Sequence, residues 1–398
     1  MVDEVLAAAA AAAVDAEEIL SFARALIAAP SENPGGTEDD AAAVAMDILG
    51  AIGASAEIIR SDEGRPSIVA AIGSSPRPSL AWNGHLDVVP VGDPSRWTHD
   101  PWDGVVEDGR LIGRGSADMK GPVASALGAA AAIRRAGIEL EGTLTFHLAA
   151  DEEHMGMYGT MVLRDRGMLV QDACIVGEPS DMRVGLAERG GAWITATARG
   201  KASHGSQPNL GVNAITSMAH LLLRLPEVLP DLEHPLVGRP SVNAAVITGG
   251  SAPNVVPDRC ELVIDRRIIP GETDPAQVLA PFDHLAATIA QEHPEVDLSF
   301  RIDGWTEAAE ASADSDIAAW AREAIASERG SRAPDVGFTG ITDARFYIND
   351  ARIPTVILGP GSLTVAHTAD EWVLVDDLVT ASRIYARIFV GFLGARRG

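Results

Sequence analysis

Two polar side chains that could do chemistry, His85 and Asp87, lie two residues apart in the stretch WNGHLDVVP. Residues two apart in a β-strand point to the same face of the sheet, so the imidazole and the carboxylate share one surface. Burying both groups costs free energy unless each has a partner. A metal ion bound by the imidazole, with the carboxylate orienting the ring from behind, is one such partner. An isolated H-x-D is more often a satisfied histidine near a strand end, so other residues must decide between the two interpretations.

Further groups with metal-binding chemistry recur after predicted strands and in loops. They are Asp118 (LIGRGSADMKGPV), Glu152 and Glu153 (AADEEHMG), Glu178 (IVGEPSD) and His367 (GPGSLTVAHTADEW). Each alone has a plain explanation, because acidic runs are usually solvated and loop residues of these types are common. Together, two imidazoles and three carboxylates without a thiolate suit two Zn²⁺, Co²⁺ or Mn²⁺ ions that share a bridging carboxylate. Such a pair of ions can hold a hydroxide and polarise a carbonyl oxygen, which leaves Glu152 free to act as a base.

The elements that must position these groups alternate between strands and helices. Helices are predicted at 16–30, at 37–53 with Thr37 as N-cap, and at 121–137; strands are predicted at 67–73, 79–90, 142–153 and 172–180. This alternation predicts an α/β domain with a mostly parallel sheet and helices on both faces. The polar residues gather where the strands end, which is the usual place for a site in an open α/β sheet.

The pattern changes near residue 184 and returns near residue 301. Between these points, period-two segments occur at 192–205, 241–250 and 259–269, and helical segments at 211–225 and 275–293. This β-α-β-β-α order predicts a small α+β domain inserted into the larger one. We therefore assign residues 1–183 and 299–398 to a metal-binding catalytic domain and residues 184–298 to the insertion. A helix at 314–328, a strand at 353–361 and an amphipathic helix at 375–394 complete the larger domain.

The composition limits the classes of partner and the cellular compartment that we expect for this protein. A formal net charge of −25 argues against nucleic acid, whose phosphates would be repelled. Two cysteines, Cys174 and Cys260, cannot build a disulfide framework or a cysteine-rich zinc site, and they fit a reducing cytoplasm. The alanine-rich N-terminus has acidic rather than basic flanks, unlike a signal peptide, and no apolar stretch reaches the roughly 18 residues of a membrane span. We expect a cytoplasmic protein without a membrane partner.

The motifs G-H-L-D-V-V-P, G-R-G-S-A-D-M-K-G, D-E-E, G-E-P-S and G-P-G-S-x-x-x-A-H-x-x-D-E occur in this order along the chain. In this it resembles the dinuclear zinc peptidase and amidohydrolase family of acetylornithine deacetylase, succinyl-diaminopimelate desuccinylase, aminoacylase and glutamate carboxypeptidase. The likeness extends from about residue 16 to the C-terminus. The resemblance implies two divalent metal ions, Zn²⁺ in the first place.

The resemblance also implies a role for each of these positions. Asp118 would bridge both ions and precede a cis peptide bond to Met119. His85 and Glu178 would complete one metal site, and Glu153 and His367 the other. Asp87 would orient His85. Glu152 would be the general base, which takes a proton from the bridging water and delivers it to the leaving amine.

The insertion resembles the family's lid and dimerisation domain. His204 would reach into the partner subunit's site and stabilise the tetrahedral oxyanion. Asn254 and Arg267 would contact the substrate's backbone and carboxylate, a task that suits the forked guanidinium group. Gly361 in G-P-G-S is assigned to the same substrate-binding set. Arg266 leaves the choice of arginine open, and without the resemblance these residues would be a loop histidine and a surface salt bridge.

We expect a homodimeric hydrolase of amino acid metabolism that cleaves the amide bond of an N-acyl amino acid by a metal-bridging hydroxide. GPGSLTVAHTADEW is most like acetylornithine deacetylase, whereas TGITDARFY (339–347) is closer to succinyl-diaminopimelate desuccinylase, so the acyl group stays open. A dipeptidase or carboxypeptidase of the same family is the alternative. A non-catalytic metal-dependent binding protein is a remote alternative, because it would have lost the base or a ligand. A serine hydrolase needs a G-x-S-x-G turn, which is absent.

Overall fold

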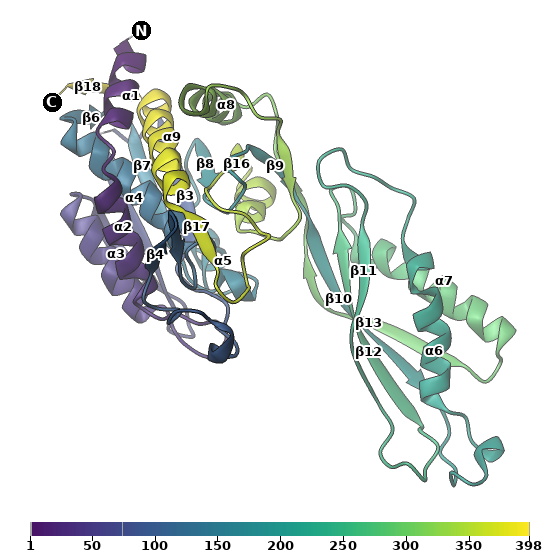
Figure 1. Ribbon diagram of the computed structural model, residues 1–398. Coiled ribbons are helices and arrows are strands. Elements are labelled where there is room, and N and C mark those ends of the chain that lie inside the picture. The colour runs from purple at the N-terminus through teal and green to yellow at the C-terminus, as the bar shows by residue number, and fades with distance from the viewer. Residues whose placement is uncertain (1, 74, 398) are drawn as a thin grey trace. The chain divides into compact units, whose positions relative to one another are not determined.

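The computed structural model describes residues 2–73 and 75–397, which form two compact units (Figure 1). The first unit comprises Met1–Leu186, Ala311–Val336 and Thr342–Gly398, and the second comprises Ala187–Glu310 and Gly337–Ile341. The second unit is therefore an insertion in the first.

The insertion is longer than the expected segment 184–298. Strand β13 (Asp297–Thr306) pairs with β10 (Gly190–Arg199) and completes the sheet of the second unit, so the chain stays there until Glu310. Most residues of β13 are half-buried or exposed on both faces. It is an edge strand without a clean alternation of apolar and polar residues, and its period-two signal is correspondingly weak.

The sheet of the first unit has the strand order β1-β2-β7-β3-β8-β16-β9. Its strands are β1 (Ser55–Arg60), β2 (Pro66–Gly73), β7 (Thr143–Ala149), β3 (Ser79–His85), β8 (Ala173–Val176), β16 (Thr355–Ile357) and β9 (Gly185–Glu188). The four central strands β7, β3, β8 and β16 run parallel, whereas β1, β2 and β9 pair antiparallel with their neighbours. The predicted α/β class with a mostly parallel sheet is confirmed.

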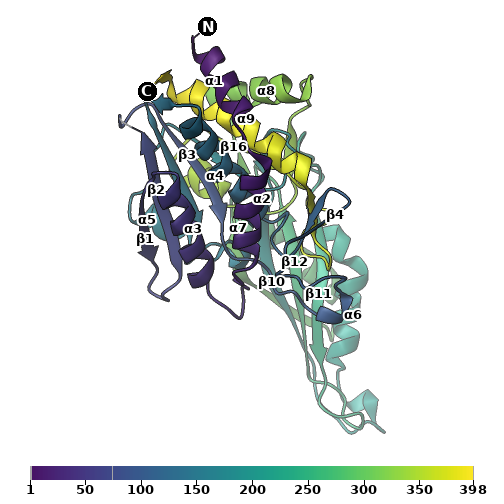
Figure 2. The ribbon, with the colours of Figure 1, turned by 60° about the vertical axis from the view of Figure 1, so that its left-hand side comes forward.

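Helices cover this sheet. They are α1 (Val2–Ala12), α2 (Ala16–Ile27), α3 (Asp39–Ala51), α4 (Lys120–Arg135), α5 (Thr160–Asp165), α8 (Asp316–Arg329) and α9 (Val375–Leu393). Figure 1 shows α9 beside α4 and α1, and Figure 2 shows α3 over β1 and β2. None of the described helices combines the length and the apolar character needed to cross a membrane.

Two adjacent residues of β7 show that both faces of the sheet are covered. Phe146 makes an edge-to-face contact with Phe389 of α9, with ring centroids 6.3 Å apart. The next residue, His147, faces the opposite side, where its Nδ1 lies 2.7 Å from the hydroxyl of Tyr347. Tyr347 belongs to a π-helical turn, Phe346–Asp350. Because neighbouring strand residues point to opposite faces, the parallel centre of the sheet lies between two layers.

Local signals in the sequence explain where the first helices begin. The side chain of Asp15 accepts the N–H groups of Glu17 and Glu18 and so caps α2. Helix α3 begins at Asp39 after Glu38, and Thr37 Oγ1 accepts the N–H of Asp39 only at 3.4 Å, so the cap expected at Thr37 is weak.

Small side chains let α2 and α4 approach closely. A Cβ atom on Gly128 of α4 would lie 2.6 Å from Ile19 Cγ1 of α2. The glycine and alanine residues of α4 therefore serve packing, and 14 residues of this helix are buried.

Two smaller sheets border the first unit. One has the order β17-β5-β4 and consists of β17 (Trp372–Leu374), β5 (Arg110–Ile112) and β4 (Val105–Glu107); the other pairs β6 (Ile138–Leu140) with β18 (Ala395–Arg397). The pairing of Trp372 with Ile112 brings the segment after His367 next to the loop that carries Asp118.

The second unit is an α+β structure. Its antiparallel sheet has the order β11-β12-β10-β13, with β11 (Ser241–Gly249) and β12 (Arg259–Ile268). Every second residue of β12 is buried, and the core of this unit joins that row with α6 (Ala214–Arg224) and α7 (Pro275–Glu292). Short strand β14 (Ala309–Glu310) pairs with β9 at Glu188 and Ala187, and β15 (Val336–Phe338) also pairs with β9.

Candidate metal centre

The parallel strands of the first unit deliver their polar residues to one edge of the sheet. Strand β3 ends at His85, β7 ends just before the turn of Glu152 and Glu153, and β8 ends two residues before Glu178. Carboxyl ends of neighbouring parallel strands lie on the same edge, so these side chains converge although they are far apart in the sequence.

Two groups of potential metal ligands form at this edge. One consists of His85, Asp118 and Glu178, and the other of Asp118, Glu153 and His367. Within each group the ligand atoms lie within 4.8 Å of one another. Asp118 belongs to both groups, which is the arrangement that a bridging carboxylate requires.

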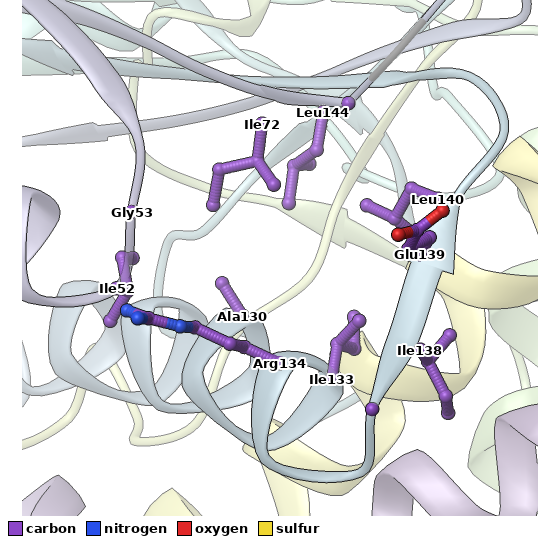
Figure 3. A pocket seen from close by; sticks show the side chains of 12 residues that line it. Ile52, Gly53, Ile72, Ala130, Ile133, Arg134, Ile138, Glu139, Leu140 and Leu144 are labelled. Atoms are coloured by element: carbon purple, nitrogen blue, oxygen red, sulfur yellow. The ribbon is translucent and has the colours of Figure 1, made fainter. Parts of the chain in front are cut away.

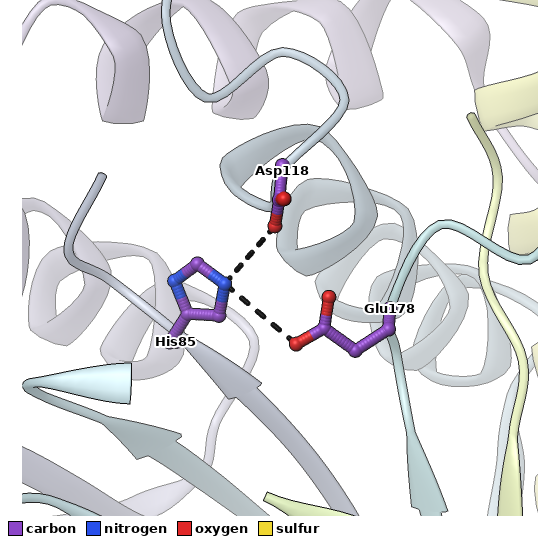
Figure 4. A group of neighbouring side chains, drawn as sticks. All are labelled: His85, Asp118 and Glu178. Atoms are coloured by element: carbon purple, nitrogen blue, oxygen red, sulfur yellow. Dashed lines mark hydrogen bonds and ion pairs between the residues drawn. The ribbon is translucent and has the colours of Figure 1, made fainter. Parts of the chain in front are cut away.

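The first group is buried and surrounds one imidazole nitrogen. His85 Nε2 lies 3.1 Å from Asp118 Oδ1 and 3.7 Å from Glu178 Oε1 (Figure 4). His85 Nδ1 lies 2.8 Å from the main-chain oxygen of Asp87, which can accept its proton. This contact leaves Nε2 as the nitrogen that faces the carboxylates.

The second group opens to solvent through its histidine. His367 Nε2 lies 3.1 Å from Glu153 Oε2 and 3.4 Å from Asp118 Oδ2. The side chain of His367 is 51% exposed, whereas those of Glu153 and Asp118 are 6% and 7% exposed. A small molecule can therefore approach the pair of groups from the side of His367.

The carboxylates of this cluster lie close together, and a bound cation would balance their negative charge. Burial, followed by repulsion among the carboxylates, raises the pKa of Glu153 and brings the pKa of Glu178 well above its usual value. Burial works to lower the pKa of His85, but the hydrogen bond to Asp118 and nearby carboxylates bring it well above its usual value. Hydrogen bonds to Asp118 and Glu153 raise the pKa of His367 to about 10. Carboxylate oxygens and imidazole nitrogens grouped in this way are typical ligands of divalent metal ions.

Glu152 lies beside the first group without belonging to it. Its Oε2 is 3.7 Å from His85 Nε2, and its side chain is 10% exposed. It occupies the first position of a 3₁₀ turn, Glu152–His154. Burial brings the pKa of the Glu152 carboxyl well above its usual value. A carboxyl group in this position can exchange a proton with a molecule held at the centre.

The contacts of Asp87 differ from the expected orientation of His85. The carboxylate oxygen Oδ1 lies 3.6 Å from His85 Nδ1, and the closer contact is made by the main-chain oxygen of Asp87. The carboxylate instead accepts the N–H groups of Glu152 and Glu153, each at 3.1 Å. Strand β3 ends at His85, so the rule that residues two apart share a face does not extend to Asp87.

Sequence reasoning missed other groups that support the turn at Glu152. Asn33 Nδ2 donates to Asp87 Oδ2 at 2.8 Å and to Asp151 Oδ1 at 3.0 Å. Arg345 Nη2 donates to the main-chain oxygen of Met155 at 2.6 Å. Asn33 lies in a loop, and an asparagine there is typical of any turn. Arg345 lies within TGITDARFY, and its residue type gives no local signal for a contact with Met155.

The loop of Asp118 contains the cis peptide bond to Met119 that the resemblance implied. Gly361 lies next to this loop, because a Cβ on Gly361 would be 3.3 Å from Ala117 Cβ. Its φ of +86° favours glycine over residues with a side chain. Gly361 therefore borders the metal-ligand groups in the first unit.

His204, Asn254 and Arg267 lie in the second unit. His204 and Asn254 belong to adjacent exposed loops, joined by the N–H of Gly205, which donates to the oxygen of Asn254 at 2.7 Å. Arg267 is half-buried and donates to Asp265 at 3.0 Å. Arg266 is 1% exposed and forms an ion pair with Glu272, so of the two neighbouring arginines Arg267 is the accessible one.

An apolar cavity elsewhere in the first unit contains none of the predicted site residues. It has a volume of about 580 Å³ and is lined mainly by aliphatic side chains, among them Ile72, Ile133 and Leu144, with Arg134 at its border (Figure 3). It lacks a group of convergent acids and bases, and we assign it no chemistry.

Comparisons with known proteins agree with this geometry. The model of peptidase family M20/M25/M40 matches residues 81–390. Acetylornithine deacetylase of Myxococcus xanthus is 32% identical over 341 residues, which cover 83% of this chain and 85% of that protein. Succinyl-diaminopimelate desuccinylase of Cereibacter sphaeroides (strain KD131) is 32% identical over 359 residues, which cover 86% and 92%.

Solved structures share the fold. A tripeptidase from Staphylococcus aureus superposes with a TM-score of 0.76 at 22% identity, over 95% of this chain and 98% of that one. A Bacillus subtilis protein described as a dinuclear metal binding peptidase superposes with a TM-score of 0.69 at 18% identity, over 95% and 98%.

Proposed function

The chain belongs to the peptidase family M20/M25/M40, and on that premise we propose that it hydrolyses the amide bond of an N-acyl amino acid with two divalent metal ions. The observation that carries this proposal is the pair of ligand groups that share Asp118, with Glu152 beside them. Relatives named acetylornithine deacetylase and succinyl-diaminopimelate desuccinylase support the N-acyl amino acid as substrate and a role in amino acid metabolism.

We assign the metal ligands as the sequence indicated: His85, Asp118 and Glu178 for one ion, and Asp118, Glu153 and His367 for the other. The donor set suits Zn²⁺ best among common cellular metals, and Co²⁺ or Mn²⁺ would also fit. Bound there, two divalent ions would activate a water molecule and polarise the scissile carbonyl group.

Residues of the chain would carry the proton through the reaction. Glu152 would accept a proton from the attacking water on its carboxylate and return it to the nitrogen of the leaving amine. Its backbone N–H is held by Asp87, which keeps the carboxylate near His85 Nε2. In the second unit, His204 would stabilise the oxyanion. Arg267 would bind the substrate's carboxylate and Asn254 its backbone. Gly361, in the first unit, would contribute to substrate binding at the border of the metal centre.

The second unit offers a surface for a homodimer. Strand β11 lies at the edge of its sheet, and seven of its nine residues are exposed. Val246 and Ile247 on this strand are 57% and 51% exposed, and Leu223 on the adjacent helix α6 is 85% exposed. An unpaired edge strand beside apolar side chains is suited to pairing with a second copy of itself. We therefore propose a homodimer in which each subunit supplies His204 to its partner.

We place the enzyme in the cytoplasm, because both cysteines are free and buried and neither belongs to the catalytic chemistry. A dipeptidase or carboxypeptidase activity is the alternative, since the structural neighbours include a tripeptidase and human carnosine dipeptidase 1. A non-catalytic binding protein is disfavoured, because Glu152 and all five proposed ligands are present.

A hydrolysis screen tests this proposal. N-acetyl, N-succinyl and N-carbamoyl amino acids and dipeptides would be offered to enzyme loaded with Zn²⁺, Co²⁺ or Mn²⁺. We expect cleavage of N-acetyl or N-succinyl amino acids to have the highest kcat/KM. Faster cleavage of dipeptides would support the alternative, and absence of hydrolysis from all of these substrates would contradict the proposed function.

A further inference from the structure

Glu371 is a fully buried carboxylate that contacts the loop of Asp118. Its Oε1 accepts the N–H of Ala117 at 2.9 Å and the N–H of Asp118 at 3.0 Å. Its main-chain oxygen accepts the N–H of Gly113 at 2.9 Å. Glu371 therefore holds this loop at both ends through the loop's backbone N–H groups, and within the loop it also pairs with the side chain of Arg114.

The second oxygen of Glu371 is neutralised by a buried arginine. Arg114 is 2% exposed, and its Nη1 donates to Glu371 Oε2 at 2.6 Å. The guanidinium group also lies over the ring of Trp97, 5.2 Å from its centroid. A buried carboxylate needs such a partner, because an unpaired charge in this environment would be costly. The pair leaves Oε1 to accept the two N–H groups.

The contacts of Glu371 repeat those of Asp87. Asp87 accepts the consecutive N–H groups of Glu152 and Glu153, and Glu371 accepts those of Ala117 and Asp118. Each carboxylate thus fixes a segment that carries a residue of the metal centre, and neither belongs to the two ligand groups. Asp118 and Glu153, which these two segments carry, belong to the same ligand group.

We propose that Glu371, held by Arg114, is a positioning residue that fixes the backbone of Asp118 and so sets the metal affinity of both sites at once. This inference rests on the proposed role of Asp118 as the shared ligand. Because Asp118 is common to both groups, a displaced loop weakens both sites, whereas loss of His367 weakens only the group that contains it. Partners that orient ligands in this way typically change metal affinity by about 10- to 100-fold when they are removed.

Calorimetric titration of the metal-free protein with Zn²⁺ tests the inference without relying on activity. We expect Glu371→Gln to lower the affinity of both sites by about 10- to 100-fold, because its amide group faces Arg114 and disturbs the pair. His367→Ala should lower the affinity of one site. Unchanged affinity of both sites in folded Glu371→Gln would overturn the inference.

Glu272→Gln is the matched control. Glu272 is 8% exposed, forms an ion pair with the buried Arg266 and accepts the N–H of Ile269 at 3.0 Å, but it lies in the second unit. Its replacement removes the same kind of contacts, and we expect both zinc affinities to stay within about twofold of wild type. Equal losses of zinc affinity in Glu272→Gln and Glu371→Gln would assign the effect to general destabilisation and overturn the inference.

A second variant keeps the test decisive if Glu371→Gln does not fold. Arg114→Lys retains the positive charge and loses the fixed geometry of the guanidinium group. Lower affinity at both sites supports the inference, and unchanged affinity overturns it. Failure of the wild-type protein to bind two ions would instead contradict the proposed function, so the two failures are distinguishable.

Discussion

His367 Nε2 lies 3.1 Å from Glu153 Oε2, although 214 residues separate them in the chain. The first unit brings them together because β7 and β16 run parallel to the strands between them and end at the same edge. The inserted second unit lies between them in sequence. The centre is thus a property of the sheet topology.

Replacing the base should separate metal binding from catalysis. Glu152 lies beside the ligand groups without belonging to them, so Glu152→Gln should retain two metal ions and the fold. Turnover should fall by about 10²- to 10⁴-fold, the usual contribution of a general base. Metal content by mass spectrometry and kcat with a saturating N-acyl amino acid check this. Near-normal kcat in the metal-loaded variant would refute the assignment of Glu152.

Asp87→Asn should loosen the turn that carries Glu152 and Glu153. In the variant, one carboxylate oxygen of residue 87 is replaced by an NH₂ group, which cannot accept the main-chain N–H of Glu152 or Glu153. The unfolding free energy should therefore fall by about 1–3 kcal/mol, and kcat should fall as well.

Asp172→Asn is the matched control for Asp87→Asn. Asp172 accepts the N–H and hydroxyl of Ser79 at the opposite end of β3, at 2.8 Å and 2.9 Å. Urea unfolding and steady-state kinetics of both variants make the comparison. A comparable loss of stability without loss of kcat is expected for Asp172→Asn. If Asp87→Asn behaves in the same way, Asp87 has no part in positioning the turn.

His204 should act across the subunit interface. The variants His204→Ala and Glu152→Gln should each be nearly inactive, whereas a mixture allowed to exchange subunits should regain activity. A mixed dimer has one site with an intact Glu152 and a partner's intact histidine. Activity of the mixture is compared with that of each variant alone, and subunit exchange is followed by native mass spectrometry. Exchange without recovered activity would contradict a shared site.

His147 should make stability depend on pH. Burial lowers the pKa of His147 to about 4, from a usual value of 6.5. As pH falls, the unfolded chain therefore binds a proton at this histidine before the native state does. The unfolding free energy should fall by up to about 3 kcal/mol between pH 6.5 and pH 4. Above pH 6.5 both states are neutral at this residue and it has no effect.

The measurement is the unfolding free energy of metal-free wild type and His147→Asn across this pH range. The variant has no titrating group at position 147, so the difference between the two proteins should change with pH. Parallel curves would show that His147 keeps an ordinary pKa in the native state.

Helices α2, α3, α4, α8 and α9 and the central strands of the first unit could be predicted because their signals are local, whereas α1 and α5 were not predicted. Apolar spacing, the cap at Asp15 and the small residues of α4 indicate these elements within a few residues. Edge strands carry weaker signals. Only Ile59 of β1 is buried, and β13 is half-buried on both faces, so β1 was missed and β13 was cut from the insertion.

The candidate ligands could be predicted because their chemistry depends on residue type, and the structure gathers all five into two groups. The groups that support them could not. Asn33, Asp87 and Glu371 act largely through hydrogen bonds to main-chain atoms or to other polar groups. Such contacts depend on where a loop lies in space, and nothing in the residue type distinguishes them from ordinary turn residues. For the same reason the contacts of Asp87 with the turn at Glu152 could not be predicted.

The most direct test of the central claim is a metal titration of the chelated enzyme, with hydrolysis of an N-acyl amino acid measured at each step. The account predicts no activity without metal and full activity after two equivalents of Zn²⁺ per chain. Asp118→Ala should lose both the binding of two Zn²⁺ ions and the activity. Full activity of the exhaustively chelated protein, or activity in Asp118→Ala equal to that of wild type, would contradict it.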